Sequence, residues 1–133
     1  TLNYIWLNSG GWSKIFDMTD QLTGYPSKED EIKAVNLIID NLRGFGPKQS
    51  RNLLQGLGLT RYEVPIDSRI TKWLNNFGFP VVVSATTLAD RNYFNFVSEG
   101  FQEICKACDI FPCVLDAAIF SSFDKEEWSD QIW

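Results

Sequence analysis

The sequence predicts an all-α fold, a helical bundle formed by a single domain over residues 1–133. Apolar residues recur at intervals of three and four positions, the spacing that places them on one face of a helix. Glycines and prolines separate these segments at positions where helices end. The run Val81–Val83 has no second strand to pair with, so we expect a buried loop there.

The first two predicted helices form a pair. One helix runs from about Lys28 to Leu42 and follows a capping box made by Ser27 and Asp30. The next begins at Pro47, because a proline lacks the N–H group that a first helical turn leaves unpaired in any case. This helix is expected to end at Gly56 or Gly58. It should bury three leucines, Leu53, Leu54 and Leu57.

Three more helices are expected after an extended connector at residues 62–66. Asp67 and Ser68 are both suitable N-cap residues for a helix that ends at Gly78. Longer helices are expected at about residues 90–107 and 112–123. The helix after Asp67 should carry its apolar residues on one face: Ile70, Trp73, Leu74 and Phe77.

Composition predicts a soluble, intracellular protein. Hydrophobic residues make up 44% of the chain, enough to fill one core. The longest apolar runs are far too short to cross a bilayer, and residues 1–12 lack the basic start and apolar stretch of a signal peptide. Three cysteines without a disulfide pattern favour a reducing compartment: Cys105, Cys108 and Cys113.

The net charge of −5 argues against nucleic-acid binding when it is taken alone, because phosphate binding depends on cations. Its distribution argues the other way. Residues 41–72 carry six cations and two acids, whereas acids outnumber cations in the segments on both sides. A single basic binding face would produce this pattern, and so would a chance fluctuation on solvated helices. The six cations are Arg43, Lys48, Arg51, Arg61, Arg69 and Lys72.

The segment Leu42–Lys48 reads Leu-Arg-Gly-Phe-Gly-Pro-Lys and lies between two predicted helices. Two glycines one residue apart allow a tight turn whose backbone amides point outward together. With the positive end of the next helix, these amides form an anion site that suits a DNA phosphate. A plain turn is the alternative. The residues expected at DNA are Arg43, Gly44, Gly46, Lys48, Gln49 and Arg51.

This turn and the segment after it resemble the helix-hairpin-helix superfamily of DNA glycosylases, which contains endonuclease III and the 8-oxoguanine DNA glycosylases. The family signature is Leu-Pro-Gly-Val-Gly-x-Lys, followed further along the chain by a Val-Asp or similar dipeptide at a helix start. Here Asp67 follows Lys48 by nineteen residues. The resemblance covers about residues 27–77, with the hairpin at about 28–58. It implies a monomer whose partner is double-stranded DNA with a damaged base, in the cytoplasm and nucleoid or in a nucleus, with no membrane partner.

Lys48 and Asp67 are the candidate catalytic residues that the resemblance assigns. The lysine amine would displace the base at the sugar and hold the sugar as a Schiff base for strand cleavage. A helix start near other cations favours the neutral amine. Asp67 would stabilise the positive charge that develops on the sugar. The alternatives are a solvated lysine that contacts phosphate and an aspartate that only caps its helix.

A weaker resemblance extends to residues 115–121, which look like the base-pocket segment of 8-oxoguanine DNA glycosylases. Phe120 stands where a phenylalanine stacks on the base, and Asp116 where a glutamine reads its edge. The resemblance therefore implies an oxidised purine such as 8-oxoguanine, and Asp116 leaves the identity of the base open. A core phenylalanine and a surface carboxylate are the alternative interpretations.

The resemblance also implies a monovalent cation, K⁺ or Na⁺, bound by the backbone carbonyls of Asp40, Leu42 and Phe45. No cofactor is expected to be required. No iron–sulfur cluster is expected either, because the three cysteines precede the last helix and lack a fourth ligand. Buried thiols are expected instead.

Two departures from the family pattern leave a second interpretation open. Arg43 replaces the usual hairpin proline, and only 41 residues precede Leu42 where family members carry a long helical region. The chain is then an N-terminally truncated piece, a minimal member, or a protein without the upstream catalytic machinery. The alternative function is a non-catalytic helix-hairpin-helix module that binds DNA or the proteins of a repair complex.

Overall fold

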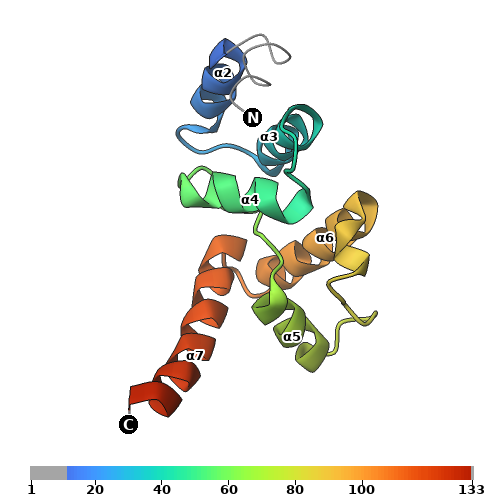
Figure 1. Ribbon diagram of the computed structural model, residues 1–133, viewed down its shortest axis with the longest axis vertical. Coiled ribbons are helices and arrows are strands. Elements are labelled where there is room, and N and C mark those ends of the chain that lie inside the picture. The colour runs from blue at the N-terminus through green and yellow to red at the C-terminus, as the bar shows by residue number, and fades with distance from the viewer. Residues whose placement is uncertain (1–11, 133) are drawn as a thin grey trace. The chain divides into compact units, whose positions relative to one another are not determined.

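The structure is a computed structural model that describes residues 12–132. All regular elements in this range are helical, so the prediction of an all-α fold is confirmed for the described chain. A short 3₁₀ helix, η1, precedes the helix labelled α6. The elements in Figure 1 are α2 (Trp12–Leu22), α3 (Lys28–Asn41), α4 (Pro47–Gly56), α5 (Ser68–Phe77), η1 (Thr87–Ala89), α6 (Arg91–Ala107) and α7 (Pro112–Ile132).

The chain divides into two compact units at the bond between Pro65 and Ile66. The first unit holds α2, α3 and α4, and the second holds α5, η1, α6 and α7. The expectation of one domain over residues 1–133 stays a prediction. None of the helices within residues 12–132 has both the length and the apolar character that crossing a membrane requires.

The start of α3 follows the prediction closely. The Ser27 hydroxyl accepts a hydrogen bond from the Asp30 N–H at 3.2 Å, and the Asp30 carboxylate accepts one from the Ser27 N–H at 3.1 Å. This capping box satisfies two amides that a helix start otherwise leaves unpaired. The core of the first unit then forms from α2, α3, α4 and the residue after α3: Met18, Leu22, Ala34, Val35, Ile38, Leu42 and Leu54.

Helix α2 was not among the predicted elements, and it packs against α3. The burial of the leucines on α4 also differs from the prediction. Leu54 is fully buried and Leu53 is partly buried, but Leu57 is 59% exposed. The reason is that α4 ends at Gly56, so Leu57 lies beyond the helical face that it was expected to share.

The second unit has its own core, built by residues of α5, α6 and α7 and of the segment before η1. Ile70 and Leu74 of α5 are fully buried, as predicted, but Phe77 is 59% exposed and stacks on Trp73 with ring centroids 5.1 Å apart. The expected buried loop at residues 81–83 is wrong in part, because only Val83 is buried. The other buried residues are Ile66, Leu88, Phe94, Val97, Phe101, Cys105 and Ile119.

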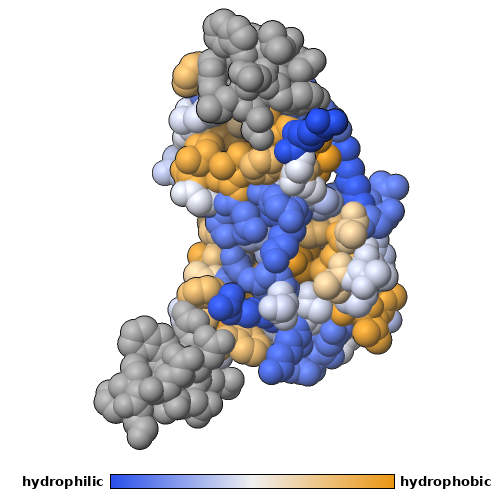
Figure 2. All heavy atoms as spheres, viewed as in Figure 1, coloured by the Kyte–Doolittle hydropathy of each residue, from blue (hydrophilic) through white to orange (hydrophobic). Residues whose placement is uncertain are grey.

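Helix α6 has the predicted extent, and α7 continues to Ile132, well past the predicted end at residue 123. Hydrophobic side chains remain among the hydrophilic ones on the visible surface (Figure 2). Exposed examples in the second unit are Val82, at 81%, and Phe96, at 49%. Apolar surface therefore persists outside both cores, which is ordinary for scattered residues.

Candidate active site

The turn between α3 and α4 carries the predicted DNA-binding residues. The N–H of Leu42 donates to the Ile38 carbonyl at 2.8 Å and ends α3, and the N–H of Phe45 donates to the Leu42 carbonyl at 3.3 Å. Gly44 has a φ of +85°, in the left-handed region that favours glycine. Gly46 has a φ of −90° and a ψ of −168°, which any residue adopts. The turn conformation therefore requires glycine at position 44 and not at position 46.

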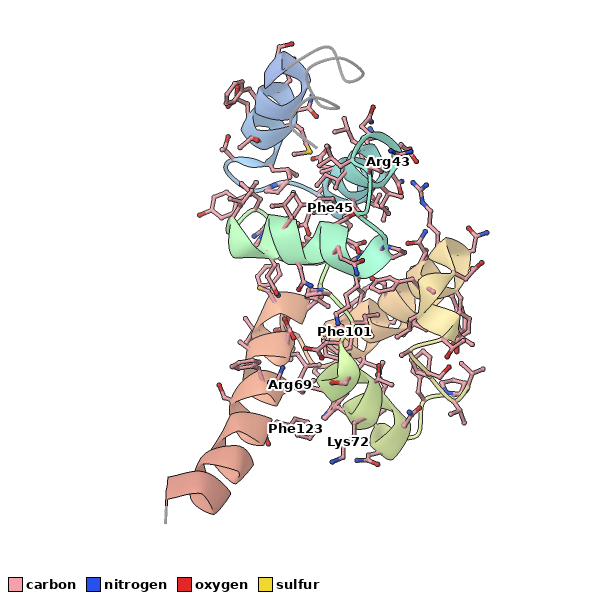
Figure 3. The ribbon with its side chains drawn as sticks, viewed as in Figure 1. Arg43, Phe45, Arg69, Lys72, Phe101 and Phe123 are labelled. Carbon is pink, nitrogen blue, oxygen red and sulfur yellow. The ribbon has the colours of Figure 1, made fainter. Side chains whose placement is uncertain are left out.

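The first turn of α4 exposes two of its side chains to solvent. Pro47 is the first helical residue, and the side chains of Lys48 and Gln49 are exposed. Gly46 is the N-cap residue, so this position has no side chain that accepts hydrogen bonds from the helix amides. Arg43 lies on the same turn and is exposed (Figure 3). This helix start therefore has no side-chain cap and lies near two exposed cations in the sequence, and its role in binding an anion stays a prediction.

Arg51 is the exception among the predicted DNA contacts, and the structure corrects that expectation. Its side chain is fully buried, and its Nε donates to the Glu63 carboxylate at 2.7 Å. Its Nη1 also donates to the Pro47 carbonyl at 2.9 Å. Arg51 lies on the buried face of α4, so its guanidinium supports the start of this helix and does not face a solvent-side phosphate.

The expected single face of six cations is reduced accordingly. Arg43, Lys48 and Lys72 are exposed, while Arg61 and Arg69 are half-buried. Arg61 donates to the Pro26 carbonyl at 3.2 Å, and its guanidinium lies 5.2 Å from the centre of the Tyr25 ring. Arg51 and Arg61 are thus both held by interactions inside the first unit.

Glu31 is a buried residue that the sequence analysis did not single out. Its carboxylate accepts hydrogen bonds from the N–H groups of Arg61, Tyr62 and Glu63, at 3.1, 2.9 and 2.9 Å. Burial raises the pKa of Glu31, and these hydrogen bonds act in the opposite direction. The sequence feature that could have identified Glu31 as buried is its position four residues before Val35, on the apolar face of α3.

Asp67 is the N-cap of α5, as predicted. Its Oδ1 accepts hydrogen bonds from the N–H groups of Arg69 and Ile70, both at 3.0 Å. Its Oδ2 lies 3.6 Å from Nη1 of Arg69, and the side chain is 26% exposed. The two oxygens therefore have separate surroundings: one caps the helix, and the other faces a cation at the surface. The catalytic role of Asp67 stays a prediction.

Helix α7 brings Phe120 to α5. Phe120 is 47% exposed, so the alternative interpretation of a core phenylalanine is wrong. The Arg69 guanidinium lies over its ring, 4.5 Å from the centroid. Lys72 and Phe123 repeat the arrangement one turn along, with the ammonium 5.2 Å from the centroid (Figure 3). Asp116 is half-buried, one turn before Phe120 on α7.

The second unit thus gathers Asp67, Arg69 and Phe120, of which Arg69 was expected only as part of a basic face. Lys48 belongs to the first unit, at the exposed start of α4. The ion pair between Asp67 and Arg69 was not predictable from helical spacing, because residues two positions apart do not ordinarily face each other.

The expected cation ligands lie where α3 ends. Asp40 is in the last turn, Leu42 is the C-cap residue, and Phe45 follows in the turn. Carbonyls at this end of a helix carry partial negative charge, which suits a cation. The cation itself stays a prediction.

The cysteines differ in their exposure. Cys105 is buried, and burial raises the pKa of its thiol to about 11. Cys108 is exposed, so the expectation of buried thiols is wrong for this residue. Within the described residues, histidine, cysteine, aspartate and glutamate side chains do not gather in groups of three or more that could hold a metal ion.

Comparison with curated proteins finds a related sequence. The chain is 29% identical over 104 residues to a protein of Thermoplasma volcanium named 8-oxoguanine DNA glycosylase/AP lyase. The match covers 78% of this chain and 48% of the relative, so the chain spans about half the length of that protein. Neither a family model nor a solved structure matches the chain.

Proposed function

We propose that this chain carries the DNA glycosylase and AP-lyase machinery of a base-excision repair enzyme, and that it removes an oxidised purine such as 8-oxoguanine. The observation that carries the proposal is the 29% identity, over 104 residues, to a protein named 8-oxoguanine DNA glycosylase/AP lyase. Two residues of this chain support it. Lys48 is exposed at the start of α4, and Asp67 presents one carboxylate oxygen at the surface.

In the proposed reaction the neutral amine of Lys48 attacks C1′ of the sugar. The bond between C1′ and the base nitrogen breaks, and the base leaves with that electron pair and takes up a proton. The attached nitrogen then loses a proton and forms a double bond to C1′, while the C1′–O4′ bond breaks and O4′ takes up a proton. The ring-opened sugar is thereby held as a protonated Schiff base. Loss of a proton from C2′ expels the phosphate at C3′, which nicks the strand.

Asp67 and Phe120 serve the base and sugar in this proposal. Positive charge develops on the sugar as the base departs, and the surface oxygen of Asp67 would stabilise it. The damaged base must leave the duplex stack before it reacts. Phe120, half exposed on α7, offers a ring on which an extruded purine stacks. Asp116 lies one turn away on α7 and would contact the edge of the base.

The turn between α3 and α4 would act as a helix-hairpin-helix that binds the DNA backbone. Contacts of this kind place the protein on the duplex without reading its sequence, as a search for damage requires. A K⁺ or Na⁺ ion on the carbonyls of Asp40, Leu42 and Phe45 would supply positive charge beside the phosphate. The proposed phosphate contacts are Arg43, Gly44, Gly46, Lys48 and Gln49.

Borohydride trapping on a duplex that contains 8-oxoguanine tests the proposal, because only an amine nucleophile leaves a covalent adduct. Wild type should give the adduct, and Lys48→Gln should abolish it without a change in helical content, since Lys48 is exposed. Lys33→Gln is the matched control. It removes the same charge from an exposed site on α3 and should leave trapping intact.

Two results would contradict the proposal. Trapping by Lys48→Gln at the wild-type rate would assign the nucleophile to another residue. Duplex binding without any adduct from the wild-type chain would support the alternative, a non-catalytic DNA-binding module.

A further inference from the structure

Arg69 lies between the two groups of the second unit that the proposed reaction uses. Its Nη1 is 3.6 Å from Oδ2 of Asp67, and its guanidinium carbon is 4.5 Å from the centre of the Phe120 ring. The other oxygen of Asp67 is engaged by two helix amides. Arg69 therefore covers two groups: Oδ2 of Asp67, which is the oxygen not used for capping, and one face of the Phe120 ring.

A stacked base and a stacked guanidinium need the same space above an aromatic ring. If an extruded purine occupies this face of Phe120, the guanidinium must leave it. Because the same guanidinium pairs with Asp67, its departure also uncovers the carboxylate.

We propose that Arg69 is a displaceable cover, which a purine base removes when it stacks on Phe120, so that seating the base also exposes the Asp67 carboxylate. This inference rests on the proposed function. A cation–π contact and an ion pair at the protein surface are each worth roughly two- to fivefold in an equilibrium constant, so the cover can be displaced. Arg69 is a positioning residue in this scheme and does not react.

The neighbouring pair of Lys72 and Phe123 provides an internal control. It joins the same two helices by the same kind of contact, 5.2 Å from ammonium to ring centre. A displacement caused by the base should affect Arg69 alone. Separation of α7 from α5 as a whole would affect both pairs.

Proton NMR distinguishes these outcomes, because aromatic rings shield protons that lie over their faces. The side-chain methylene protons of Arg69 and Lys72 should both be shielded in Lys48→Gln protein, which prevents turnover. Addition of a duplex with 8-oxoguanine should remove the shielding at Arg69 and retain it at Lys72. An undamaged duplex should leave both unchanged. Retention at Arg69 in the damaged complex, or loss at both residues, would overturn the inference.

A second measurement uses 8-oxo-2′-deoxyguanosine, a nucleoside without phosphate, so that the loss of a cation does not alter phosphate attraction. Arg69→Gln removes the competitor for Phe120 and should tighten nucleoside binding about two- to fivefold. Lys72→Gln should leave this affinity unchanged, and equal effects of the two variants would contradict the proposal.

The two proposals fail in different ways. If the wild-type chain traps 8-oxoguanine DNA but Arg69 stays on Phe120, only the cover is wrong. If the chain neither traps nor binds that duplex, the proposed function is wrong and the cover is wrong with it.

Discussion

Helices α4 and α5 begin in opposite ways. The N-cap of α4 is Gly46, which has no side chain to offer, and Pro47 follows it. The N-cap of α5 is Asp67, whose carboxylate accepts hydrogen bonds from two amides of the first turn. An external anion can therefore use the amides of α4, whereas those of α5 are already engaged. The start of α4 suits a phosphate, and the start of α5 offers negative charge to a cation.

The two helix starts also differ in what lies behind them. Buried charge supports α4, because Arg51 joins the Pro47 carbonyl to the Glu63 carboxylate. Apolar residues support α5, where Ile70 and Leu74 are fully buried. The first arrangement depends on ionic partners that must all be present, whereas the buried residues behind the Asp67 cap contribute apolar packing.

Arg51→Met should have the largest effect on stability. It leaves the buried Glu63 carboxylate without its ion-pair partner, and breaking a buried pair costs about 3–5 kcal/mol. Urea unfolding followed by circular dichroism measures this loss. The double variant Arg51→Met/Glu63→Leu should recover much of the stability, because it removes both charges. A single variant as stable as wild type would mean that the ion pair does not support α4.

Asp67→Asn should slow base excision roughly a hundredfold, the scale of losing one charge-stabilising group. Asparagine still caps a helix, so the thermal midpoint should change little and duplex affinity should stay within a few-fold. Single-turnover excision of 8-oxoguanine measures the rate. A variant that loses stability but excises at the normal rate would mean that Asp67 only caps α5.

Gly46→Asp should have the smallest effect on binding and stability. The substitution gives α4 the type of side-chain cap that α5 already has. The added carboxylate would occupy the anion site, so duplex affinity should fall about fivefold while stability rises by a few tenths of a kcal/mol. Gly46→Asn is the matched control, with the same shape and no charge, and should weaken binding less. Fluorescence anisotropy with a labelled duplex measures both. Unchanged affinity in Gly46→Asp would show that this helix start does not bind phosphate.

Much of the fold follows from local sequence signals. The capping box at Ser27, the proline that begins α4 and the aspartate that begins α5 are all confirmed. Each of these signals acts between residues no more than four positions apart, so a short stretch of sequence contains the whole interaction.

The candidate site was less predictable. Lys48 and Arg51 are one turn apart on α4, and sequence alone treats them as two similar cations. Their burial differs because Glu63, twelve residues after Arg51 in the sequence, pairs with Arg51 inside the protein. Similarly, Phe120 lies about fifty residues after Arg69, so no local pattern reveals that their side chains stack.

The sequence by itself determined the helical class, the boundaries of four helices and the tight turn at Gly44, because caps and backbone preferences act locally. Tertiary structure alone decided which charges are buried. Glu31 binds amides that lie thirty residues further along the chain, and Arg69 meets an aromatic ring of another helix. A buried charge is tolerated only where distant partners satisfy it, and those partners become neighbours only after the helices have packed.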